Sequence, residues 1–228
     1  YYYRVFINNV LFEGQQYSFI SFPFEEVSRN FSFVAMADLG NDTRRRAPTY
    51  LRAAIDRPRF MIQLGDWDHR DPQTLAEMRR MHREVTSNAT ASGRDFKNFL
   101  AITTPLFHVW DDHDYGMENG DYTFAAKQDA IQAFKEYYPT PDLPNGDEGI
   151  WHSFRFAHSE YFMLDVRSNR DPNTEPDGPE KSLLNGQNIP NGQKEWLFNG
   201  LLNSTARWKF IISGVNFNPT CKPDDSWG

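Results

Sequence analysis

Three short apolar runs that each end in acidic residues constrain the fold of this chain more than any other feature. The runs, with the residues that follow them, are 33–37 with Asp38, 60–65 with Asp66, and 106–110 with Asp111, Asp112, His113 and Asp114. Nearly continuous apolar runs of this length are typical of strands buried on both faces of a sheet. Because the carboxyl ends of parallel strands meet at one edge, the sequence predicts that these acidic side chains gather at one rim.

Helical and strand-like segments alternate along the rest of the chain, and this order predicts an α/β domain. We expect helices at 48–56, 72–85, 123–137 and 193–202, and strands at 31–37, 60–64, 106–110, 150–156, 161–166 and 208–213. The strands 150–156 and 161–166 are expected to form a hairpin, followed by a long loop over 167–192. Residues 2–23 alternate loosely around 13–15 and predict one or two strands with a turn there.

Charge and cysteine content exclude several classes of protein. The chain has 24 Lys and Arg against 31 Asp and Glu, a net charge of −7, which disfavours nucleic acid as a stable partner. Its single cysteine, Cys221, excludes an internal disulfide and cysteine-based zinc or iron–sulfur sites. No apolar run approaches the roughly 20 residues of a membrane span.

Carboxylates packed at one rim repel one another, so such a cluster must be partly protonated or neutralised by cations. Imidazoles stand close behind two of the acidic ends, at His69 and His113. Carboxylate and imidazole together suit iron, manganese or zinc, with a harder ion such as calcium as a second occupant. The alternative is that each Asp is only a turn residue, because Asp is common after strands.

Several motifs carry a resemblance to a known family. Asp38, the pair Gly65-Asp66 and the stretch 110–116 (Trp-Asp-Asp-His-Asp-Tyr-Gly) stand at the three strand ends. Further segments follow in the same order, at 149–155, 164–170, 193–197 and 208–209. From about residue 31 to its end, the chain resembles the metallophosphoesterase superfamily, and within it the PhoD-like alkaline phosphatases.

This resemblance implies a calcineurin-like metallophosphatase fold, a β-sandwich flanked by helices in four layers (αββα). It also implies two regions in the chain. Residues 1–30 would be the tail of an N-terminal β-sandwich-like domain with its linker, and 31–228 the N-terminal portion of the phosphatase domain. The chain would then be incomplete at both ends, with an open site and an exposed apolar sheet edge near 208–213.

The resemblance further assigns roles to particular residues. It implies that Asp38, Asp66, His69 and Asp112 bind two metal ions, with Asp66 bridging them, and that His113 contacts the phosphate and assists the leaving group. His69 stands where relatives that hold ferric iron usually have Tyr, which leaves the metals open among iron, calcium, zinc and manganese. Arg167 and Arg170 follow the strand 161–166 and are expected to bind the substrate phosphate. A solvated or ion-paired position in the loop is the alternative for both arginines.

The function that follows is hydrolysis of phosphate monoesters or diesters by a metal-activated water. The alternatives are a catalytically inactive binding or structural module and a phospholipase-type esterase on the same scaffold. The sequence also has four Asn-X-Ser/Thr sites, at Asn30, Asn41, Asn88 and Asn203. We expect N-glycans at Asn30, Asn88 and Asn203 and a secreted, extracellular or periplasmic protein. A glycan at Asn41 would crowd the site.

Overall fold

The computed structural model describes residues 1–12, 16–23, 30–39, 47–186, 189–222 and 225–227. Its helices are α1 (Ala47–Ile55), α2 (Leu75–Val85), α3 (Ala91–Phe96), the π-helix η2 (Lys97–Ala101), α4 (Asp112–Tyr115), α5 (Lys127–Tyr137) and α6 (Gln193–Asn203). Its strands are β1 (Tyr2–Tyr3), β2 (Phe6–Ile7), β3 (Val10–Leu11), β4 (Tyr17–Ser18), β5 (Val34–Met36), β6 (Met61–Gln63), β7 (Leu106–His108), β8 (His152–Phe156), β9 (Ser159–Met163) and β10 (Trp208–Ile212).

Two three-stranded sheets form the centre of the molecule. The first has the order β5-β6-β7 and is fully parallel, so the three strands with acidic ends run side by side as predicted. The second has the order β10-β9-β8, in which β8 and β9 form the expected antiparallel hairpin and β10 pairs with β9 in parallel. The α/β class is therefore confirmed.

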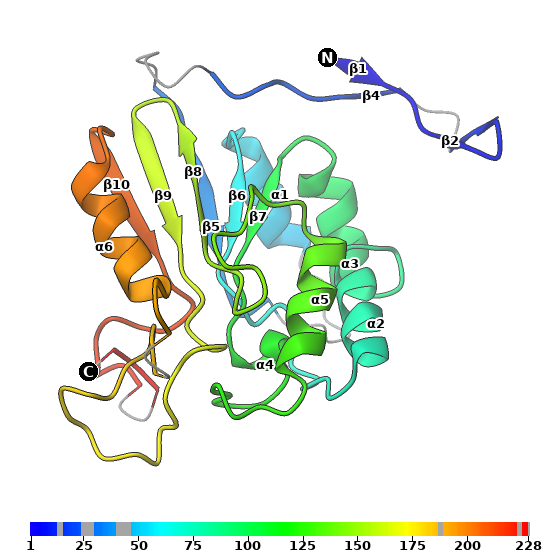
Figure 1. Ribbon diagram of the computed structural model, residues 1–228. Coiled ribbons are helices and arrows are strands. Elements are labelled where there is room, and N and C mark those ends of the chain that lie inside the picture. The colour runs from blue at the N-terminus through cyan, green and yellow to red at the C-terminus, as the bar shows by residue number, and fades with distance from the viewer. Residues whose placement is uncertain (13–15, 24–29, 40–46, 187–188, 223–224, 228) are drawn as a thin grey trace.

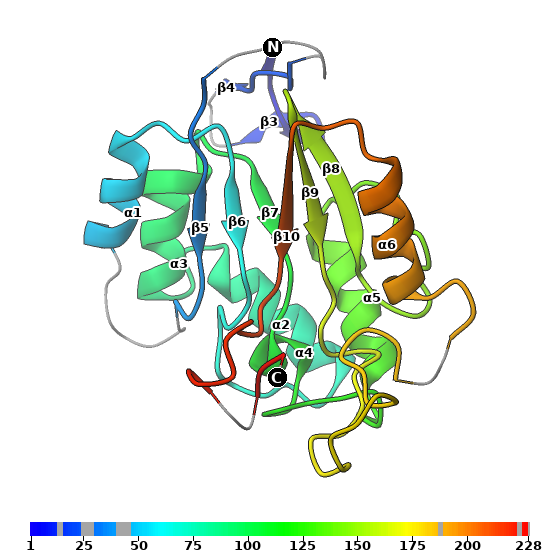
Figure 2. The same ribbon diagram turned by 90° about the vertical axis from the view of Figure 1, so that its left-hand side faces the viewer.

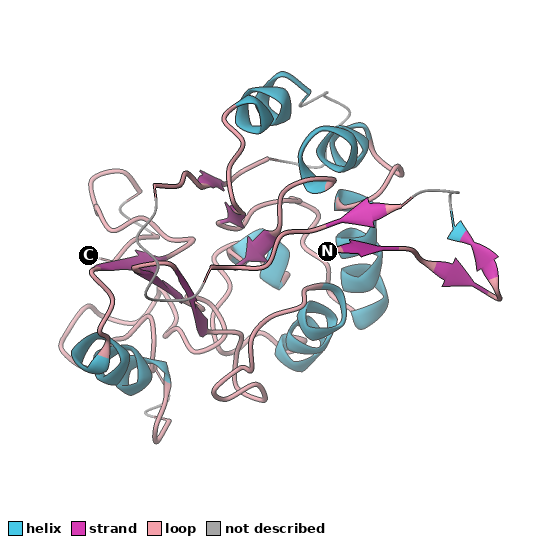
Figure 3. Cartoon of the chain, turned by 90° about the horizontal axis from the view of Figure 1, so that it is seen from above, coloured by secondary structure: helices cyan, strands magenta, loops and turns pink. Residues whose placement is uncertain are grey.

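The two sheets pack face to face between two layers of helices, as Figures 1 and 2 show. An aromatic-rich core that includes Phe60, Phe154 and Tyr161 fills the space between the sheets. A second core lies between the first sheet and helices α1, α2, α3 and α5, and a third lies between the second sheet and α6. Seen from above in Figure 3, helices flank the strands on two sides. This four-layer arrangement is the αββα fold that the resemblance implied.

Helix ends follow local signals in the sequence. The side chain of Thr74 accepts a hydrogen bond from the N–H of Glu77 (3.3 Å) and caps α2, which therefore begins three residues after the predicted start at 72. The segment 91–101 carries no strong apolar period, and its two short helices, α3 and η2, were not predicted. No helix in the described part of the chain is long and apolar enough to cross a membrane.

Residues 2–18 form two small antiparallel ribbons, β1-β4 and β2-β3, at the end of the molecule opposite α4 (Figure 1). The tight turn joins β2 and β3 at Asn8 and Asn9, whose φ angles of 49° and 64° suit the left-handed turn of a hairpin. The turn predicted at 13–15 lies outside the described residues. Phe22 packs against Phe156, with ring centroids 4.8 Å apart, and so joins the segment to the inter-sheet core. Assignment of these residues to a separate domain stays a prediction.

Strand β10 is the outer strand of its sheet and exposes apolar side chains, as predicted. Trp208 is 59% exposed and Ile211 is 39% exposed. The unpaired edge and these side chains form a surface on which another strand could pair.

Candidate metal centre

The ends of β5, β6 and β7 approach one another closely, and Gly65 permits this approach. Its φ is +100°, and a Cβ atom there would lie 2.3 Å from the backbone nitrogen of Asp111. Any side chain at position 65 would therefore push the end of β6 away from the start of α4. The N–H of Asp38 donates to the carbonyl of Gly65 (3.2 Å), and Asp38 and Asp66 both have positive φ, so both turn sharply out of their strands.

The acidic stretch after β7 forms the first turn of the short helix α4. Asp111 caps this helix, and the side chains of Asp111 and Asp114 each accept a hydrogen bond from the other's backbone N–H. Asp114 also accepts the N–H of Trp67 (3.0 Å), so it fastens the loop after β6 to α4. Burial, followed by the charge of Asp66, raises the pKa of Asp114 well above its usual range. Asp114 thus has a structural role.

Two groups of candidate ligands share one residue. Asp66, Asp111 and Asp112 offer oxygen atoms that all lie within 4.8 Å of one another. Asp66, His69 and His113 do the same with oxygen and nitrogen atoms. Asp66 therefore lies where a single carboxylate could face two cations.

Asp66 has the electrostatic properties expected of a metal ligand. Burial, followed by the charges of Asp111 and Asp112, raises its pKa to about 7. Its Oδ1 atom is buried without a hydrogen-bond partner among the described residues. A buried carboxylate oxygen in this state is costly, and a cation would remove the cost. The donor set of carboxylates and imidazoles fits divalent or trivalent ions of the iron, zinc, manganese and calcium type.

His69 contacts two of the other three predicted ligands. Its Nε2 atom lies 3.2 Å from Oδ1 of Asp38 and 3.8 Å from Oδ2 of Asp66. The side chain of Asp38 is 77% exposed, so His69 is its main contact with the cluster. The structure thus brings together all four residues predicted as metal ligands, because Asp112 belongs to the group around Asp66.

His113 stands edge-on to His69, with ring centroids 4.6 Å apart. Its Nδ1 atom lies 2.7 Å from Oδ1 of Asp71, which leaves Nε2 as the ring nitrogen available to a ligand. Burial opposes a charge on this ring, but the bond to Asp71 and the charges of Asp112 and Asp66 raise the pKa of His113 above its ordinary value. Asp71 was not singled out from the sequence, although it lies only five residues after Asp66.

Arg167 is fully buried and holds carboxylates from two distant segments. Its Nε donates to Oδ1 of Asp111 (2.7 Å), and its two terminal nitrogens donate to the two oxygens of Asp225 (3.1 and 2.7 Å). The guanidinium of Arg170 also donates to Asp225. These contacts match the ion-paired alternative for both arginines, and the role of either in binding substrate stays a prediction. In the sequence, Asp225 lies in the segment 224–228, which resembles part of a PhoD-like motif, but sequence reasoning gave the residue no role.

Arg167 also shapes the charge of its partners. Burial tends to raise the pKa of Asp225, but the bonds and charge of Arg167, with Arg170 and Lys222, hold it well below its usual range. Burial likewise opposes a charge on Asp112. The charge of Arg167 and the N–H of Asn119, which lies 2.7 Å from Oδ2, nevertheless lower the pKa of Asp112. These contacts therefore favour the anionic form of Asp112, the form that binds a cation.

Comparison with known proteins identifies the family to which this geometry belongs. The family model described as PhoD-like phosphatase matches residues 50–226. The chain belongs to the PhoD-like phosphatase family. Alkaline phosphatase D of Bacillus subtilis (strain 168) is 28% identical over 186 residues, which cover 68% of this chain and 30% of that protein.

Solved structures have the same fold. A structure of PhoD superposes with a TM-score of 0.71 at 21% identity and covers 92% of this chain and 46% of its own. The purple acid phosphatase PPD1 from yellow lupin seeds superposes with a TM-score of 0.57 at 13% identity and covers 96% and 36%. The chain thus spans about a third of the length of its curated PhoD-like relative and less than half of the PhoD chain.

Proposed function

We propose that the protein of which this chain is part is a metal-dependent phosphoesterase that hydrolyses phosphate monoesters or diesters. The observation that carries the proposal is Asp66, a half-buried carboxylate with one buried, unpartnered oxygen and a raised pKa, shared by two groups of ligands. Membership of the PhoD-like phosphatase family supports the same reaction.

Asp38, Asp66, His69 and Asp112 would hold the metal ions in this proposal, with Asp66 between them. The ions, when bound, would supply charge neutralisation at the phosphoryl oxygens and a water acidic enough to attack at neutral pH. His113 would hydrogen-bond to the phosphoryl group or the leaving oxygen through Nε2. Asp71, on the other ring nitrogen, would fix the orientation of that ring and favour its protonated form.

Several finer assignments belong to this proposal. The metals are drawn from iron, calcium, zinc and manganese, and the number of two follows from the sharing of Asp66. The protein is secreted and carries N-glycans at Asn30, Asn88 and Asn203, all three of which are exposed. Residues 1–30 belong to a preceding β-domain. The surface at Asn41 lies outside the described residues.

Chelation tests the proposal directly. We expect the protein that contains the whole domain to hydrolyse p-nitrophenyl phosphate, to lose at least nine-tenths of that activity after exhaustive dialysis against chelator, and to regain it with added metal. Elemental analysis before and after dialysis would count the ions. Full activity in protein shown to be free of metal would overturn the metal-dependent mechanism.

The same measurements separate the two alternatives. An inactive binding module would hold metal and hydrolyse no phosphate ester. A phospholipase-type esterase would act on phospholipid micelles in preference to p-nitrophenyl phosphate. The pairing of His113 with Asp71 beside the acidic cluster favours an active enzyme, because a module without catalysis has no need of an oriented imidazole there.

A further inference from the structure

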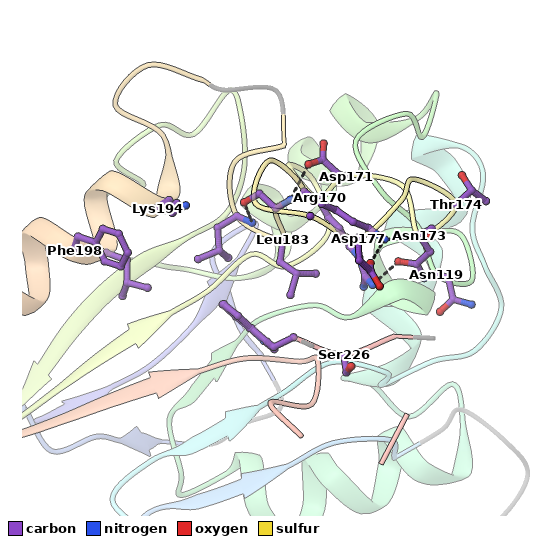
Figure 4. A pocket seen from close by; sticks show the side chains of 16 residues that line it. Asn119, Arg170, Asp171, Asn173, Thr174, Asp177, Leu183, Lys194, Phe198 and Ser226 are labelled. Carbon is purple, nitrogen blue, oxygen red and sulfur yellow. Dashed lines mark hydrogen bonds and ion pairs between the residues drawn. The ribbon is translucent and has the colours of Figure 1, made fainter. Parts of the chain in front are cut away.

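A cavity of about 770 Å³ lies beside the metal centre, in the range of small-molecule sites. It lies between the start of α6 and the segment 170–184, with Asn119, Ser226 and Trp227 completing its wall (Figure 4). We call it the α6 pocket. Neither the family's ligand motifs nor the predicted site residues, apart from Arg170, fall within it.

Asn119 and Arg170 connect the α6 pocket to the metal centre. The backbone N–H of Asn119 donates to Oδ2 of Asp112, while its side chain lines the pocket. Arg170 lines the pocket and shares Asp225 with Arg167, which in turn holds Asp111. The α6 pocket and the acidic cluster therefore lie next to each other, on either side of these residues.

Both apolar and charged side chains line the α6 pocket. Leu183, Leu197 and Phe198 supply apolar surface, and Phe198 is 55% exposed although it is a large aromatic side chain. Lys194 and Phe198 lie four residues apart on α6 and so share one face of the helix. The pocket thus offers apolar surface beside the ammonium group of Lys194.

Lys194 is the one charged group of this wall for which the described part of the chain shows no partner. Lys181 donates to Asp177 (2.8 Å), Arg170 pairs with Asp225, and Asp171 accepts the N–H of Ser182 (2.8 Å). An exposed lysine often has no ionic partner within its own fold. On the wall of a cavity, its charge attracts an anion.

We propose that the α6 pocket binds the alcohol half of the phosphate ester and favours an alcohol with an apolar chain and an anionic end. The inference rests on the proposed function, because the phosphoryl half is placed at the metal centre. Leu183, Leu197 and Phe198 would cover the apolar chain, and Lys194 would meet the anionic end.

A matched pair of substrates tests the inference. Hexyl phosphate and 6-(phosphonooxy)hexanoate have the same six-carbon chain and differ in the terminal carboxylate. We expect Lys194→Ala to raise KM for the carboxylate ester about three- to tenfold and to leave KM for hexyl phosphate and both kcat values unchanged. Lys194→Arg should keep the wild-type preference, and Phe198→Ala should raise KM for both esters. Lys209→Ala is the control, since this lysine lies on β10 outside the pocket and donates to the carbonyl of Ala206.

A binding measurement separates failure of this inference from failure of the proposed function. 6-Hydroxyhexanoate, titrated without metal into ¹⁵N-labelled protein, should shift the indole N–H signal of Trp227 saturably in the wild type and Lys209→Ala, and only weakly in Lys194→Ala. If 6-hydroxyhexanoate binds in this way but the protein hydrolyses no ester, the proposed phosphoesterase function is wrong and the proposed binding of the ligand in the α6 pocket is supported. If the protein hydrolyses both esters and Lys194→Ala changes neither KM, or changes the two KM values equally, the α6 pocket is not the site of the alcohol.

Discussion

At the scale of single residues, Asp66 connects the two candidate metal-binding groups. It is the member common to both, and its unpartnered oxygen shows that the fold does not satisfy this carboxylate by itself. Asp114 lies only two residues from Asp112, but each of its carboxylate oxygens accepts a hydrogen bond from a backbone N–H. Neighbouring aspartates of one motif thus have different roles, decided by what surrounds each carboxylate.

We expect Asp66→Asn to lose more metal than any other single change among the proposed ligands and to lower kcat by about 10²-fold or more, because Asp66 would be a ligand to both ions. The metal-free variant should be at least as resistant to urea as the metal-free wild type, since the change removes carboxylate repulsion. Metal content and denaturation curves measure both effects. Asp38→Asn, at an exposed carboxylate, is the matched comparison, and an equal loss of metal there would contradict the bridging role.

We expect His113→Ala to lower kcat by about 10²–10⁴-fold while the protein keeps its metal, because in the proposed function this ring hydrogen-bonds with the substrate. Asp71→Asn should also keep the metal and lose less activity, since it only orients the ring. Elemental analysis beside steady-state kinetics distinguishes these effects. If metal is lost together with His113, the residue is a ligand instead.

At the scale of elements, the buried cluster of Arg167 with Asp111 and Asp225 holds three segments together. It joins the start of α4, the loop after β9 and the last described segment of the chain, across the carboxyl ends of both sheets. The charge of Arg167 also lies 4.0 Å from Oδ2 of Asp112, so the same contact that joins the segments offsets part of the acidic repulsion.

We expect Arg167→Gln to lower the free energy of unfolding by about 3–5 kcal/mol, because it leaves the buried carboxylate of Asp111 without its cationic partner and removes one of the cationic partners of Asp225. The double variant with Asp225→Asn should lose less than the sum of the two single changes. Urea denaturation of the three variants measures the coupling. Arg79→Gln, which breaks an exposed pair with Glu136, is the control and should change stability little. If the losses of unfolding free energy in Arg167→Gln and Asp225→Asn simply add in the double variant, the two side chains do not stabilise the protein through their contact.

At the scale of the whole molecule, three histidines lie in the packed interior and make stability depend on pH. Burial lowers the pKa of His82 to about 4, and it lowers the pKa of His108 and His152 as well. The unfolded chain would bind protons at these sites near pH 6.5 while the folded one does not, so they cost stability as pH falls. The raised pKa values of Asp66, Asp111 and Asp114 act in the opposite direction.

We expect His82→Gln to remove part of the acid sensitivity. Between pH 6.5 and pH 4 the wild type should lose stability relative to this variant by a few kcal/mol, because only the wild type must keep a buried imidazole neutral. Urea midpoints of metal-free protein at several pH values measure the difference. The hydroxyl of Tyr138 lies 3.1 Å from Nδ1 of His82 and can bond to the amide instead. A constant difference across this pH range would show that His82 titrates normally.

The sequence by itself determined the strands with acidic ends, the α/β order, the hairpin of β8 and β9 and the residues at the centre of the site. These depend on local periodicity and on motifs a few residues long, which the linear order preserves. The partners of the site's charges depended on the tertiary structure. Asp71 meets His113 from 42 residues away, and Asp225 meets Arg167 from 58. Such pairs carry no local signal, because a charged side chain in a loop looks the same in sequence whether it ends in water or against a buried carboxylate. Packing of the two sheets and the loops at their carboxyl ends decides between these outcomes, and it also forms the α6 pocket.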